Sequence, residues 1–273
     1  MKGLDNLGNT CYFNCSLQCL LQVPQLSNYM ILKNYNGEDS FVQEYQSLVR
    51  KVWLKGDGTV NPEKLLKLFR ERCTQFRTDD QHDSQEAFLC LLDILDKSLS
   101  NIIRLIFYSK TIQETVCKSG RSIRTEVTPV TILSSKDGDT IEQSLRRHQD
   151  WSVLEGFQDD NGVTHHVATT RTLFWELPKV LVFTTRMYGE KVRIKVSDTL
   201  NMRPYIAKGS PPQSTEYQLF ACCKHHGSAH GGHYVAYTKH KGQWYIKNDG
   251  FCMKTELPLE DYYYMLLYKI VSI

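Results

Sequence analysis

The spacing of apolar residues changes from a helical to a strand period near residue 106. Before that point, apolar residues recur every three or four positions, which predicts helices at 11–23, 41–52, 61–69 and 83–99, while 25–36 gives a mixed pattern. After it, alternating β-rich runs predict strands at 111–116, 125–133, 166–175, 180–185, 191–196, 217–222, 234–238, 244–247 and 265–271. A helical pattern at 141–154 interrupts them, and 207–212 is expected to be a flexible surface loop. The pattern therefore predicts an α+β protein with a helical first part and a sheet-rich second part.

Composition narrows the class of protein. The 273 residues carry a net charge of +3 with no run of Lys or Arg, so neither nucleic acid nor an anionic membrane is an expected partner. No stretch has the length of a membrane span, and the chain opens on a polar loop rather than an apolar signal region. The nine cysteines contain no C-x-x-C pair and no framework spacing, which favours free thiols in a reducing compartment. We expect a protein of the cytoplasm, and also of the nucleus.

The stretch from Gly3 to Asn14 holds a candidate nucleophile. A glycine-punctuated loop leads to Thr10, a good N-cap, so Cys11 is expected in the first turn of a helix. Free backbone N–H groups and the helix dipole favour a thiolate there. Asn6 could curl back across Gly8 and point its amide at a developing oxyanion. The alternative at this point is that Cys11 is a buried packing residue.

A second candidate region, 224–237, is rich in histidine and glycine. A metal site made only of imidazoles is a weak ligand set, and a core role for all the histidines is disfavoured. We expect a mobile glycine-rich flap that ends at His233, at the start of a strand. If the turn of the next hairpin is centred on Lys241, residues whose numbers sum to about 482 face one another. His233 then lies opposite Asn248 or Asp249, which completes a nucleophile, a base and an orienting group with Cys11.

The run from Gln81 to Glu86 precedes the fourth predicted helix. Its Asp83-x-x-Glu86 spacing resembles a capping box, which by itself explains both carboxylates structurally.

Three separate sequence motifs, called boxes below, resemble motifs of the ubiquitin-specific protease family. They are residues 3–14, the Gln-His-Asp-x-Gln-Glu run at 81–86, and residues 217–237 with Gly-His-Tyr at 232–234. Weaker similarities continue to Leu266-Leu267-Tyr268, so the resemblance spans nearly the whole chain. It implies one domain over 1–273 with a papain-like right-hand fold. The helical thumb would occupy 1–105, short β fingers and the start of the palm 106–190, and the palm sheet 191–273.

The resemblance also implies residue roles. Cys11 would be the nucleophile, His233 the general base, and Asn248 the third member with Asp249 beside it. Asn6 and the Cys11 backbone N–H would be the oxyanion donors. Asp83 and Glu86 would pair with arginines in the ubiquitin tail, and 227–232 would lie beside the tail channel. The other positions that the resemblance assigns to substrate binding are Gln81, Gly231, Gly232 and Tyr234.

The chain departs from the family pattern at the fingers, which often carry two C-x-x-C zinc knuckles. The first remains only as Cys117-Lys118-Ser119-Gly120, and the second is Asp159-Asp160-Asn161-Gly162. One thiolate with scattered carboxylates is not a structural zinc site, so we expect no metal and no other cofactor. Three further positions depart from the pattern: Cys15 replaces a common Ser, Thr184 a common His, and Lys247 a common aromatic residue.

The leading hypothesis is a monomeric thiol isopeptidase that acts on ubiquitin or on a ubiquitin-like modifier with the same diglycine tail. The first alternative is a catalytically weak ubiquitin-binding module. The second is a papain-like peptidase acting on ordinary peptides, which leaves the 81–86 run without a role.

Overall fold

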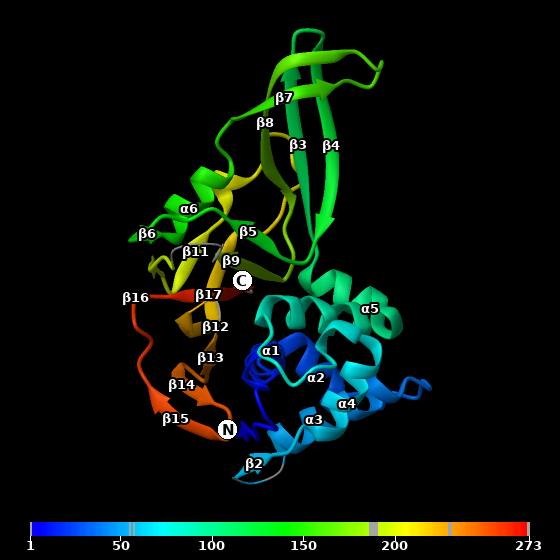
Figure 1. Cartoon of the computed structure of the whole chain (residues 1–273), viewed down its shortest axis with the longest axis vertical. Helices are drawn as coiled ribbons and strands as arrows, with labels where there is room; N and C mark the ends of the chain where they lie inside the picture. The colour runs from blue at the N-terminus through cyan, green and yellow to red at the C-terminus, as the bar shows by residue number, and fades with distance from the viewer. Residues whose placement is uncertain (1, 55, 57, 186–190, 229–230, 272–273) are drawn as a thin grey trace.

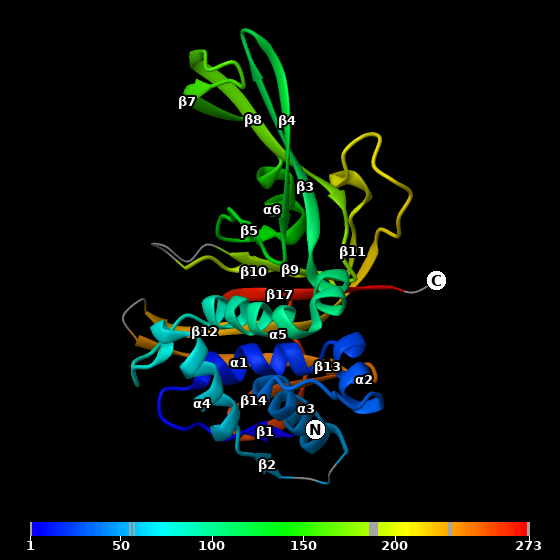
Figure 2. The same ribbon diagram turned by 90° about the vertical axis from the view of Figure 1, so that its right-hand side faces the viewer.

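The computed structural model describes residues 2–54, 56, 58–185, 191–228 and 231–271. Helices fill the first part of the chain, as predicted, and gather on one side of the large sheet (Figures 1 and 2). They are α1 (Cys11–Leu21), α2 (Pro24–Leu32), α3 (Ser40–Leu54), α4 (Glu63–Arg72), a 3-10 turn (Thr74–Phe76) and α5 (Ser84–Phe107). The longest helix, α5, is interrupted at Leu99, whose φ and ψ are −131° and 30°.

Helix α1 is the centre of the helical layer. All of its residues are buried, and it packs against α5 on one side and strand β13 on the other. Because α1 is buried on every face, its polar side chains need hydrogen-bond partners, and the amide N–H groups of Asn14 and Gln18 both donate to such partners. The 25–36 prediction missed α2, because Pro24 both stops α1 and occupies the first turn of the next helix.

Eight strands form the large sheet: β5 (Thr131–Leu133), β9 (Val180–Thr185), β11 (Thr199–Asn201), β12 (Glu216–Ser228), β13 (Gly231–His240), β14 (Gln243–Asn248), β15 (Phe251–Thr255) and β17 (Tyr263–Ile270). Their order is β15-β14-β13-β12-β17-β9-β5, with β11 paired to β12. One cluster of buried apolar side chains joins this sheet to the helices. A second cluster consists of different side chains, among them Tyr217, Tyr263 and Tyr268 of the sheet.

A separate four-stranded sheet projects away from the helices and the large sheet (Figures 1 and 2). It has the order β4-β3-β8-β7 and consists of β3 (Ser109–Cys117), β4 (Gly120–Thr128), β7 (Ser152–Gln158) and β8 (Thr164–Glu176). The short strands β1 (Gly3–Leu4) and β2 (Thr59–Val60) pair with each other, and β6 (Asp139–Thr140), β10 (Ile194–Lys195) and β16 (Glu260–Asp261) form a third small group.

Two predicted elements are shorter than expected. The helix predicted at 141–154 is α6 (Ile141–His148), which ends before β7 begins at Ser152. The strand predicted at 191–196 is reduced to the two residues of β10. Among the residues that the structure describes, no helix is both long and apolar enough to cross a membrane.

The β13–β14 hairpin differs from its predicted register by one residue. His240 pairs with Gln243, so the loop contains only Lys241 and Gly242, with φ values of 49° and 82°. Positive φ at both loop residues is typical of the tight type I′ turn. Paired residue numbers therefore sum to 483, as in Ala236–Lys247, and this pair is the last of the ladder.

Candidate active site

Cys11 begins helix α1 but is almost entirely covered, with 4% of its surface exposed. Thr10 precedes the helix without capping it, because its hydroxyl accepts from Leu7 N and donates to Asn6 Oδ1 instead. The side chain predicted to cap α1 thus faces the loop that carries Asn6.

The electrostatic environment of Cys11 differs from the one expected for a helix N-terminus. Burial raises the pKa of the Cys11 thiol above its ordinary value, while hydrogen bonding to the backbone of Tyr234 and of Tyr12 lowers it. The carboxylate of Asp249 raises the pKa further. Burial is the largest effect, so the expected shift toward a thiolate is not found in the free protein.

His233 and Asn248 meet by their side chains. Nε2 of His233 lies 2.6 Å from Oδ1 of Asn248, and 3.9 Å from Oδ2 of Asp249. An amide oxygen only accepts, so Nε2 must carry the proton and Nδ1 keeps a lone pair that can act as a base. The register shift would set Gly250 opposite His233, but the ladder ends at Ala236–Lys247, and the imidazole reaches Asn248 beyond it.

Asp249 organises the loop that carries Asn6. Its Oδ2 accepts from Asn6 Nδ2 at 2.8 Å, and its Oδ1 accepts from Asn14 Nδ2 at 2.8 Å. The opposite end of the Asn6 amide, Oδ1, accepts from the backbone N–H groups of Gly8 and Thr10. The Asn6 amide is therefore fixed in orientation, with one Nδ2 proton on Asp249 and the other available to a ligand. Sequence reasoning gave Asn14 no role, although it stands in the same box as Cys11.

A close approach of two backbones holds Asp249 beside this loop. Leu4 N donates to Asp249 O at 2.8 Å, and a Cβ added at Gly3 would lie 2.2 Å from the carbonyl oxygen of Gly250. Only glycine at position 3 allows that contact. The first strand is thereby pressed against the turn that carries Asp249.

The two carboxylates predicted to bind the substrate tail have different environments. Asp83 is the N-cap of α5: its Oδ1 accepts from Gln85 N and Glu86 N, and its Oδ2 accepts a short hydrogen bond from the Tyr264 hydroxyl. Glu86 is exposed, and within the described part of the chain its side chain makes no hydrogen bond or ion pair. The capping interpretation thus holds for Asp83, whereas Glu86 does not complete a capping box.

The remaining predicted binding residues lie where the helices meet strand β13 of the large sheet. Gln81 Oε1 accepts from Gly232 N at 2.6 Å, which connects the 81–86 run to β13. Tyr234 packs against His225, with ring centroids 4.4 Å apart, and against Tyr264. The predicted flap is largely strand, because Gly227 pairs with Gly232 and Ser228 with Gly231. Residues 229 and 230, and with them one histidine of the cluster, lie outside the described residues.

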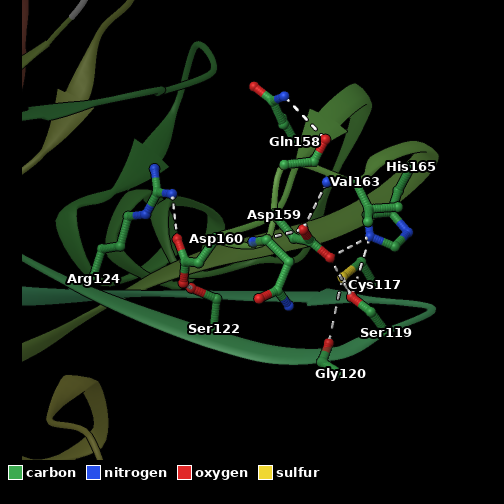
Figure 3. A network of polar contacts seen from close by, with 12 residues as sticks. Cys117, Ser119, Gly120, Ser122, Arg124, Gln158, Asp159, Asp160, Val163 and His165 are labelled. Atoms are coloured by element: carbon green, nitrogen blue, oxygen red, sulfur yellow. Dashed lines mark hydrogen bonds and ion pairs between the residues drawn. The ribbon is translucent and has the colours of Figure 1, made fainter.

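The tip of the projecting sheet carries the residues that stand at the knuckle positions (Figure 3). Cys117, Asp159 and His165 bring one possible metal-ligand atom each within 4.8 Å of the others. Sequence reasoning missed His165, because it stands outside both knuckle spacings. Ser119 lies among them: its hydroxyl donates to Asp159 Oδ2 at 2.8 Å and lies 3.1 Å from both His165 Nε2 and Cys117 Sγ.

These residues do not fit a structural zinc ion. The second position of each knuckle is a glycine, Gly120 in the first and Gly162 in the second, and neither has a side chain to offer. Asp159 is already saturated, because Oδ1 accepts from the backbone N–H groups of Asn161 and Val163 and Oδ2 accepts from Ser119 and contacts His165 Nε2 at 2.9 Å. These hydrogen bonds, His165 first, lower the pKa of Asp159. The two hairpin tips are thus joined by hydrogen bonds where tetrahedral zinc needs four ligands.

The other departures from the family pattern are buried. Cys15 and Cys19 are 3% and 0% exposed, as packing residues should be, and Cys15 Sγ lies 2.7 Å from Cys223 Sγ. Thr184 is fully buried in β9. Lys247 is also buried, directly before Asn248.

Comparison with known proteins assigns the class. The family model described as "Ubiquitin carboxyl-terminal hydrolase" matches residues 2–268, and the chain belongs to this family. It is 24% identical to ubiquitin carboxyl-terminal hydrolase Usp2 of Drosophila melanogaster and 23% identical to ubiquitin carboxyl-terminal hydrolase 51 of Mus musculus, over 90% and 98% of this chain. The chain spans 32% and 50% of the lengths of those relatives.

The fold agrees with solved structures. The chain superimposes over its whole length, with a TM-score of 0.85 and 20% identity, on 70% of a chain from the SAGA Ubp8/Sgf11/Sus1/Sgf73 DUB module bound to ubiquitin aldehyde. A structure of the same module bound to monoubiquitin gives the same TM-score at 19% identity. The predicted α+β right-hand fold of the ubiquitin-specific proteases is confirmed. The internal boundaries at 105 and 190 stay a prediction.

Proposed function

We propose that the chain is a thiol isopeptidase that removes ubiquitin, or a ubiquitin-like modifier with the same diglycine tail, from lysine side chains. The observation that carries the proposal is the bond from His233 Nε2 to Asn248 Oδ1, which leaves Nδ1 as a base on the strand next to Cys11. Membership of the family, and relatives named as ubiquitin carboxyl-terminal hydrolases, support the same substrate class.

In this proposal each residue has a defined chemical role. His233 Nδ1 takes the proton of Cys11, whose Sγ attacks the carbonyl carbon of the last glycine. Asn6 Nδ2 and the Cys11 N–H donate to the oxyanion, and His233 then protonates the departing lysine amine. Water hydrolyses the thioester with His233 as base. Asn248 keeps the imidazole in the required tautomer, and Asp249 keeps Asn6 in place.

The test is reaction with ubiquitin, and separately with ubiquitin-like modifiers, that carry a C-terminal electrophile. We expect one covalent adduct, on Cys11, which Cys11→Ala abolishes while Cys15→Ala and Cys19→Ala retain it. Labelling that survives Cys11→Ala but not Cys15→Ala would contradict the assignment of the nucleophile.

One observation favours the alternative, a ubiquitin-binding module without turnover. Burial raises the pKa of Cys11, which disfavours its reactive form. Ubiquitin binding that is saturable while the electrophilic probes fail to react would select this alternative.

The described cysteines are all free thiols, which supports the cytoplasm and nucleus as the compartment.

A further inference from the structure

Lys247 is a buried lysine without a carboxylate partner in the described part of the chain. It is 2% exposed, and its Nζ donates to Oε1 of Gln18 at 2.6 Å. Burial lowers the pKa of Lys247 to about 8, and the thiols of Cys252 and Cys19 act in the opposite direction. A buried amine with a single neutral acceptor costs stability, so its presence one residue before Asn248 requires an explanation.

Gln18 connects this lysine to the other parts of the site. It lies on α1, two helical turns after Cys11, and is itself 2% exposed. Its Nε2 donates to Lys2 O at 3.0 Å, which leaves Oε1 for Lys247 and so fixes the amide orientation. One turn earlier on α1, Asn14 Nδ2 lies 3.4 Å from Leu4 O. Gln18 on α1 thus contacts two segments. Its Nε2 binds the segment that leads to Asn6, and its Oε1 binds Lys247 on β14.

The position of Lys247 in the hairpin makes this contact consequential. Ala236–Lys247 is the last backbone pair between β13 and β14, while His233 and Asn248 lie beyond it. Asn248 pairs only with Phe251 of β15, the edge strand of the sheet. Past Lys247, no ladder bond sets the distance between the strand of the base and the strand of its acceptor.

We propose that Lys247 is a positioning residue: through Gln18 it fixes β14 against α1 and thereby holds Asn248 in line with His233 and Cys11. Lys247 touches neither substrate nor reacting atoms, and it acts on the reaction only through Asn248. The inference rests on the proposed function for its kinetic consequence, but the placement of His233 is measurable without turnover.

Lys247→Met tests the proposal, because it keeps the length of the stem and removes the donor. Small displacements of catalytic groups can cost up to about 100-fold, so we expect kcat on a ubiquitin–fluorophore substrate to fall about tenfold or more, with KM nearly unchanged. In an Asn248→Ala background the same change should alter kcat by less than about twofold, because the group that it positions is gone. Lys239→Met is the matched control, since Lys239 lies on β13 of the same sheet and pairs with Asp198. We expect it to leave kcat unchanged.

The NMR chemical shifts of the His233 imidazole nitrogens separate this inference from the proposed function, because they report the hydrogen bond from Nε2 to Asn248. Lys247→Met should move these shifts toward the values found in Asn248→Ala, and Lys239→Met should not move them. Unmoved shifts, or an equal loss of kcat in both backgrounds, overturn the proposal. If Lys247→Met does not fold, Gln18→Met breaks the same bond from α1 and must give the same pattern. A wild-type protein that processes no ubiquitin substrate would refute the proposed function alone.

Discussion

The side-chain amide of Asn6 donates to Oδ2 of Asp249 at 2.8 Å, across 243 residues of chain. This bond fixes the orientation of the Asn6 amide, which we propose as an oxyanion donor. Asp249 can therefore influence the reaction without touching the substrate. Asp249 is therefore expected to matter as much as Asn6 itself, although it only comes within 3.9 Å of His233.

Removing either residue should remove the same stabilisation. Loss of one oxyanion donor typically lowers kcat about 10²- to 10³-fold, and we expect Asn6→Ala and Asp249→Ala to fall in that range with little change in KM. The double variant should be no worse than Asn6→Ala, as expected for residues that act as one unit. Asn9→Ala, in the same loop and bonded to Asp79 O, is the control. Additive losses would show that Asp249 acts independently of Asn6.

The reactivity of Cys11 should depend on pH in a way that reports its burial. Because burial raises the pKa of the thiol above its ordinary value, the thiolate forms only as the pH rises past that value. The rate of alkylation of Cys11 by iodoacetamide in the free protein should therefore still be rising at alkaline pH. Mass spectrometry of the Cys11 peptide measures it, and a rate that levels off below pH 7 would contradict the prediction.

The structure divides the roles of the two tail-binding candidates. Asp83→Ala removes an N-cap, which costs about 1 kcal/mol, and also leaves the Tyr264 hydroxyl without its acceptor. Glu86→Ala is an exposed change expected to stay within about 0.5 kcal/mol of wild type. If Glu86 pairs with an arginine of the tail, its removal should lower kcat/KM for ubiquitin but not for a tail whose arginines are replaced.

Glu71→Ala, another exposed glutamate on the helical side, is the control for this comparison. Equal turnover by Glu86→Ala and wild type on the normal tail would leave Glu86 without a role in recognition.

The projecting sheet should be stable without metal. Its hairpin tips are joined by Ser119, Asp159 and His165, so metal analysis should find less than one zinc per chain and a chelator should leave Tm unchanged. His165→Ala should instead lower the protection of the β3–β4 and β7–β8 tips in hydrogen exchange. Stoichiometric zinc that is lost together with Tm would defeat this prediction.

Lys247 should give stability a distinctive pH dependence. Its folded pKa of about 8 lies below the ordinary value of 10.5, so between these values the unfolded chain binds more protons and stability rises with pH. Wild type should therefore gain stability relative to Lys247→Met from pH 8 to 10.5, and the difference should be constant below that range. Cys252 and Cys19 face the amine, so the comparison is repeated in a Cys252→Ala background. A constant difference throughout would mean that Lys247 is not desolvated.

The spacing of apolar residues was enough to predict an element where interactions between residues near in sequence determine it. The apolar spacing after Cys11 predicted α1. The hairpin argument placed His233 opposite Asn248 or Asp249, and the family resemblance named Asn248. The pattern failed at Pro24, which follows α1 and also begins α2. It also failed at the β13–β14 turn, where the positive φ of Lys241 allows a two-residue loop and shifts the register of the hairpin by one residue. Asn14 and Gln18 were missed because their partners are distant in the chain, and polarity alone does not identify a partner. His165 was missed because it stands outside both knuckle spacings, although its partner Asp159 is close in the chain.

The contact between the first strand and the β14–β15 turn also sets the order in which the site can be completed during synthesis. Leu4 and Asn6 leave the ribosome before Asp249, which both of them contact and which follows Asn6 by 243 residues. At about 5–20 residues per second, the 243 intervening residues take roughly 10 to 50 s. Throughout that interval the nascent chain carries Cys11 and Asn6 without the carboxylate that orients the Asn6 amide, so the proposed oxyanion donor is assembled only after Asp249 has been made.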